Sequence, residues 1–86
     1  MNAHIAIWFD DTHGDEGWAF SASINGGELT DSGPIDDDDP NADIVEIVSA
    51  VADYLDGWGG IVRDDVADIN NWAVDADGSV KYGVDL

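Results

Sequence analysis

Apolar and polar residues alternate in two segments near the start of the sequence, residues 4–9 and residues 18–24. The alternating apolar residues are Ile5, Ile7 and Phe9 in the first segment and Trp18, Phe20, Ala22 and Ile24 in the second. A period of two places one face of a β-strand against a core. Because the connection between them is polar and contains two glycines, the pattern predicts an antiparallel hairpin.

A helical period follows in the middle of the chain. Pro40 suits a first helical position, Asp39 suits the N-cap before it, and three of the residues 57–60 are glycines, where a helix would stop. At 100° per residue, an arc of about 180° collects the apolar side chains. They are Ile44, Val45, Ile47, Val48, Val51, Ala52, Tyr54, Leu55 and Trp58. The pattern predicts one long amphipathic helix with this arc buried.

The remaining patterns are shorter. Residues 28–30 suit a brief third strand, and residues 61–69 suit a short helix with Ile61, Val66 and Ile69 facing inward. Near the end, apolar residues alternate on both sides of the turn signal in residues 75–78. They are Trp72 and Val74 before the turn and Val80, Tyr82, Val84 and Leu86 after it. The sequence therefore predicts an α+β fold over residues 1–86, with an antiparallel sheet of two hairpins, one long helix packed on it and a second short helix.

The charge of the chain restricts its function. Its 86 residues include 20 Asp plus Glu and 2 Lys plus Arg, a formal net charge of −18. Such a surface does not attract phosphate backbones, so we expect no direct binding of nucleic acid. With 44% hydrophobic residues and four Trp, the chain nevertheless has the composition of a folded domain.

Catalytic and targeting motifs are not found in the sequence. The chain has no Cys, which excludes disulfides, thiolate metal sites and cysteine nucleophiles. It contains no phosphate loop, nucleophile elbow or dinucleotide fingerprint. Residues 10–16 gather carboxylates and one imidazole, but their spacing defines no metal site, and a solvated loop explains them as well. We read no signal peptide and no membrane-spanning run, and expect a soluble cytosolic protein that is not an enzyme and binds no cofactor.

The acidic residues form three groups along the sequence. They are Asp36, Asp37, Asp38 and Asp39, then Asp43, Glu46, Asp53 and Asp56 on the outer face of the predicted helix, then Asp64, Asp65 and Asp68. Capping explains one or two of the first group. On the helix, the i,i+3 pairs Asp43–Glu46 and Asp53–Asp56 repel, and the second pair lies toward the negative end of the helix dipole. Folding alone does not favour this arrangement, which suggests a functional surface.

The spacing of these charges suggests what the surface imitates. Asp43 and Asp56 are 13 residues apart, about 20 Å of helix, and DNA presents one charge per about 1.7 Å of its axis. The helix with its flanking Asp groups approaches that density. In size and charge layout the chain resembles the small acidic DNA-mimic proteins of bacteriophages, especially the anti-CRISPR proteins that inhibit type I surveillance complexes, the type I-C inhibitors in particular.

The resemblance implies a non-catalytic inhibitor in the host bacterial cytoplasm. Such a protein occupies the basic site where the Cas surveillance complex reads the protospacer-adjacent motif, and so excludes target DNA. Two alternatives remain: a salt-adapted accessory protein, and an immunity protein or antitoxin that neutralises a basic nuclease. Salt adaptation normally spreads Asp and Glu over all faces, whereas here Asp outnumbers Glu by 17 to 3 and occurs in runs, which favours mimicry.

Overall fold

The predicted first hairpin is present. In the computed structural model, which describes residues 2–10, 17–35, 39, 41–76 and 78–85, strand β1 (Asn2–Asp10) pairs antiparallel with strand β2 (Gly17–Ile24). Alternate residues of both strands are buried, as the period of two predicts. A tight turn with left-handed backbone at Asn25, Gly26 and Gly27 leads to strand β3 (Leu29–Pro34), which is longer than the expected strand in residues 28–30.

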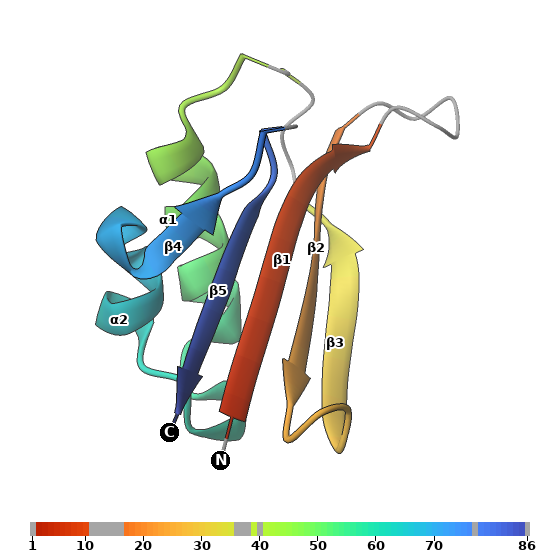
Figure 1. The fold of residues 1–86 in the computed structure, drawn as a ribbon, viewed down its shortest axis with the longest axis vertical. Helices are drawn as coiled ribbons and strands as arrows, with labels where there is room; N and C mark the ends of the chain where they lie inside the picture. The colour runs from red at the N-terminus through yellow and green to blue at the C-terminus, as the bar shows by residue number, and fades with distance from the viewer. Residues whose placement is uncertain (1, 11–16, 36–38, 40, 77, 86) are drawn as a thin grey trace.

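The second hairpin joins the first through the two ends of the chain. Strand β4 (Trp72–Val74) pairs with strand β5 (Val80–Asp85), and β5 pairs antiparallel with β1. The result is one five-stranded antiparallel sheet with the order β3-β2-β1-β5-β4, in which the first and last strands are neighbours near its centre (Figure 1). The fold is the predicted α+β class.

The helices lie on one side of this sheet (Figure 1). Helix α1 (Ile44–Leu55) is followed by a 3-10 turn η1 (Trp58–Gly60), a short helix α2 (Arg63–Ala67) and a second 3-10 turn η2 (Ile69–Asn71). The core between sheet and helices consists of Ala3, Ile5, Ile7, Trp18, Phe20, Ala22, Ile24, Ile47, Val48, Val51, Ala52, Leu55, Ile61, Val66, Trp72, Val80 and Tyr82. In the part of the chain that the structure describes, no helix has the length and apolar character needed to cross a membrane.

The start of α1 differs from the prediction. Its N-cap is Asp43 and not Asp39, because the Asp43 carboxylate accepts a hydrogen bond from the backbone N–H of Val45 at 3.0 Å. Asp39 instead closes a separate turn, in which its carboxylate accepts from the N–H of Asn41 at 2.9 Å. Two Asp residues four positions apart both suit a cap, and the apolar period begins only at Ile44.

The buried arc of α1 is narrower than predicted. Val45 and Tyr54, at the two edges of that arc, are 43% and 64% exposed, and Trp58 lies beyond the end of the helix. The helix stops because Gly57 adopts a left-handed backbone with φ of 78°. Gly59 also has a positive φ, and a Cβ atom there would lie 2.8 Å from Cγ1 of Ile24, so this turn passes too close to β2 for any larger residue.

Candidate acidic interface

The helical side of the molecule carries seven exposed carboxylates. We call them the helical acidic surface: Asp43, Glu46, Asp53, Asp56, Asp64, Asp65 and Asp68. They come from α1 and α2, which pack against each other, and from the residues that flank these helices. Asp39 is also exposed, whereas Asp36, Asp37 and Asp38 lie outside the described residues. The structure therefore brings the second and third predicted groups together.

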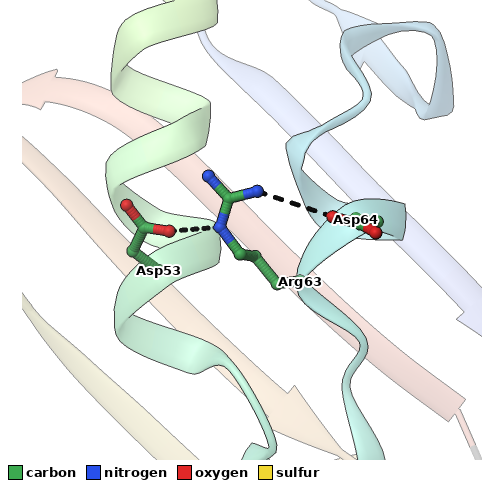
Figure 2. Close-up of polar contacts among 3 residues, drawn as sticks. All are labelled: Asp53, Arg63 and Asp64. Atoms are coloured by element: carbon green, nitrogen blue, oxygen red, sulfur yellow. Dashed lines mark hydrogen bonds and ion pairs between the residues drawn. The ribbon is translucent and has the colours of Figure 1, made fainter.

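One cation lies within this surface. Arg63 on α2 donates from Nε to the Asp53 carboxylate on α1, and its Nη1 lies 3.5 Å from a carboxylate oxygen of Asp64 (Figure 2). The hydrogen bond with Asp53, together with the negative charge of that residue, raises the pKa of Arg63. Helix α1 itself has no Lys or Arg, and α2 supplies this one positive charge beside its outer face. Asp53 links the two helices.

Several of the carboxylates also stabilise the local backbone. Asp43 caps α1, and Asp68 accepts from the N–H of Asn70 at 3.0 Å. Asp64 and Asp65 stand in the first turn of α2, where the helix dipole favours negative charge.

Asp56 is different, because it follows the last residue of α1, at the negative end of the dipole. Its side chain makes no hydrogen bond or ion pair with the described residues. Asp56 therefore shows the clearest conflict between the charge and local stability.

Two indole groups of the sheet hold the acidic segments in place. Trp18 on β2 donates from Nε1 to the carbonyl oxygen of Asp39 at 2.8 Å, just before α1. Trp72 on β4 donates in the same way to Val66 of α2, also at 2.8 Å. The sequence pattern places both Trp residues on the apolar face of a strand, and their indole N–H groups give no periodic signal that would reveal this second role.

Tyr82 links the buried side of β5 to the acidic surface. Its ring packs against Trp72, with the ring centroids 5.3 Å apart. Burial raises the pKa of Tyr82, and the negative charge of Asp65 raises that pKa further. The phenol therefore stays neutral at physiological pH and adds no charge to the surface.

The described strand residues on the opposite face of the sheet include few acids. Among the strand residues whose side chains the structure describes, strand register places an acid on this face only at Asp10, the last residue of β1. The other residues on this face include His4, Ala6, Trp8, Ala19, Ser21, Ser23, Thr30, Ser32, Pro34, Ala73, Lys81 and Gly83. The negative charge of the described residues is therefore concentrated on one side of the molecule.

The structure gives no geometry for a metal centre. Across residues 2–10, 17–35, 39, 41–76 and 78–85, no three His, Asp or Glu side chains gather in a way that would hold a metal ion. Residues 11–16, most of the loop considered as metal ligands, lie outside these ranges.

The chain is an open-faced α+β sandwich with one strongly acidic side. No protein-family model, curated protein or solved structure matches it.

Proposed function

We propose that this protein is a non-catalytic inhibitor whose helical acidic surface imitates DNA and occupies the basic DNA-binding site of a partner protein. The partner we propose first is a type I CRISPR surveillance complex of subtype I-C, blocked where it reads the protospacer-adjacent motif. The action takes place in the cytoplasm of the bacterial host. The protein contacts neither nucleic acid nor membrane.

The observation that carries this proposal is the one-sided charge. Seven exposed carboxylates crowd the helical side, with Arg63 as the one cation among the described residues there. Among the described strand residues, the open face of the sheet carries an acid only at the end of β1, at Asp10. Salt adaptation would favour carboxylates on both faces, since both meet the solvent. A concentrated acidic face is what a basic binding site requires.

The layout of the charges supports mimicry of a duplex. Helix α1 with its flanking Asp43 and Asp56 forms one acidic row about 20 Å long, and Asp64, Asp65 and Asp68 form a second row along the neighbouring α2. Arg and Lys side chains that are arranged to bind phosphate groups also bind carboxylates. Long-range attraction also raises the association rate at low salt. Binding at the site excludes DNA without any chemical step.

The experiment measures how the protein displaces a labelled DNA duplex from a purified type I-C surveillance complex. The duplex carries the protospacer-adjacent motif. The parent protein should release the DNA, with less effect as salt rises. Glu46→Lys should raise the concentration needed for half-release about tenfold or more, because like charges meet at the contact. Glu28→Lys is the matched control, since Glu28 is an exposed residue of the β2–β3 turn, and it should stay within about twofold of the parent.

The choice of variant depends on the local contacts. Glu46 is the preferred position because Asp43 caps α1 and Asp53 pairs with Arg63. If the parent releases no DNA from this complex, that partner is wrong, and capture from host lysate becomes the next measurement. Capture of a toxin nuclease would support the immunity alternative, and capture of no basic protein would overturn mimicry altogether.

A further inference from the structure

An apolar groove runs beside the helical acidic surface, between the end of β3 and helix α1. It has a volume of about 290 Å³ and is lined by Phe20, Pro34, Ile35, Ala50, Val51 and Tyr54. Tyr54 forms one wall, and its side chain is 64% exposed. Its ring is supported by Phe20, with a centroid distance of 5.3 Å and an interplanar angle of 63°. The groove thus presents a supported aromatic ring on an exposed site.

Helix α1 carries two acidic residues close in sequence to those that line the groove. Glu46 lies one helical turn before Ala50, and Asp53 directly precedes Tyr54. The chain has only one Arg and one Lys, Arg63 and Lys81. Arg63 pairs with Asp53 and Asp64. Lys81 pairs with Asp75 at 2.9 Å. A cation for this groove must therefore come from another molecule.

The combination of an apolar wall, an aromatic ring and a carboxylate selects one type of side chain. We infer that the groove receives an arginine side chain of the basic partner, with its aliphatic stem against Pro34 and Ala50 and its guanidinium beside the ring of Tyr54, on the acidic side of the molecule. This inference rests on the proposed function and names the contact that anchors it. Arginine is favoured over lysine because its planar guanidinium stacks on aromatic rings and pairs with carboxylates in a fork.

Two peptides of equal charge test the inference. Fluorescein-labelled octa-arginine and octa-lysine are titrated with the full protein in about 0.1 M salt, and anisotropy reports binding. The parent should bind octa-arginine several-fold more tightly than octa-lysine. Tyr54→Ala should reduce this ratio about threefold or more without changing octa-lysine binding, whereas Tyr54→Phe should keep the ratio, because the ring and not the hydroxyl makes the contact.

Further variants guard against a trivial loss of binding. Ala50→Leu fills the groove at an exposed helix position without changing the charge, so it should lower the ratio as Tyr54→Ala does. Val74→Ala removes another exposed apolar side chain, 66% exposed on β4, and should leave the ratio unchanged. Circular dichroism confirms that each variant is folded.

The outcomes separate the groove from the proposed function. A ratio that survives both Tyr54→Ala and Ala50→Leu overturns the arginine site, even if the parent displaces DNA from the surveillance complex. Competition by an uncharged leucine-rich peptide for octa-arginine would also overturn it, since the groove would then be an apolar site. The DNA-displacement assay on the parent alone decides the proposed function, whatever the peptides show.

Discussion

The indole of Trp72 on β4 donates a hydrogen bond to the carbonyl oxygen of Val66 in α2, at a distance of 2.8 Å in the protein interior. Carbonyl groups in the last turn of a helix have no partner within the helix. Helix α2 has only five residues, too few to be stable alone. The bond from Trp72 and the burial of Val66 therefore hold α2, and with it Asp64 and Asp65, against the sheet.

Replacing this indole should destabilise the protein. Trp72→Phe leaves the Val66 carbonyl without its donor and opens space in the core, so we expect a loss of about 1–3 kcal/mol in the free energy of unfolding. Urea denaturation followed by circular dichroism measures it. Val74→Ala on the same strand, at a side chain 66% exposed, should change stability by less than about 0.5 kcal/mol. Equal stability of Trp72→Phe and the parent would contradict this role.

The cap of α1 gives a second prediction. Asp43→Ala should lower the free energy of unfolding by about 0.5–2 kcal/mol, because the N–H of Val45 loses its acceptor. Asp43→Asn should stay within a few tenths of a kcal/mol of the parent, since Asn caps as well as Asp. Thermal melts of the two variants decide between capping and charge. If Asn were as harmful as Ala, the carboxylate charge and not the cap would matter at this position.

Asp56 should behave in the opposite way. Its carboxylate stands at the negative end of α1, so Asp56→Asn should leave stability unchanged or raise it by a few tenths of a kcal/mol. The same substitution should weaken displacement of DNA from the surveillance complex, because it removes a charge from the helical acidic surface. Paired melting and displacement measurements test this. A variant that is less stable than the parent would show that Asp56 has a structural role.

Salt should not be required for folding. The apolar core beneath the helices is continuous, and screening at about 0.1 M salt already weakens repulsion between exposed charges. We expect cooperative unfolding at this salt concentration without added metal, and a melting temperature that rises with salt. Circular dichroism across a salt series checks it. A chain that stays unfolded below about 1 M salt would favour salt adaptation.

Stability should fall in alkali because of Tyr82. Burial and the charge of Asp65 raise its folded pKa above the ordinary value near 10. Below about pH 10 the phenol is protonated in both the folded and the unfolded chain, and its contribution to the free energy of unfolding is fully present. Above that pH the unfolded chain releases the proton first, so stability falls until the pH passes the folded pKa. Tyr82→Phe should reduce this alkaline loss in denaturant titrations from pH 9 upward, and an unchanged profile would contradict it.

Local patterns predicted the elements better than their connections. The period of two located β1 and β2 because one face of each strand is buried and the other is polar. The pairing of β1 with β5 joins the two ends of the chain, and no local pattern encodes it. The helix start was misplaced because Asp39 and Asp43 both suit a cap. Tyr54 was assigned to the core because it lies at the edge of the apolar arc, where the neighbouring strand decides exposure.

The acidic positions were easier to predict than their contacts. Charged residues on the outer side of an amphipathic helix are exposed by the same period that buries the apolar side, and the described acids of α1 are exposed. The pair between Asp53 and Arg63 spans ten residues and depends on the way α2 folds back on α1. The groove beside Tyr54 joins α1 to residues at the end of β3, which no sequence period relates.

The separation of the described acids onto one side of the sheet contributes an electric dipole roughly perpendicular to the sheet. In the field of a positively charged body such a dipole experiences a torque, so the molecule rotates and presents its helices first. At about 0.1 M salt the field extends only about 10 Å from its source. The rotation is therefore confined to the last nanometre of approach, where it increases the fraction of collisions that meet in the right orientation.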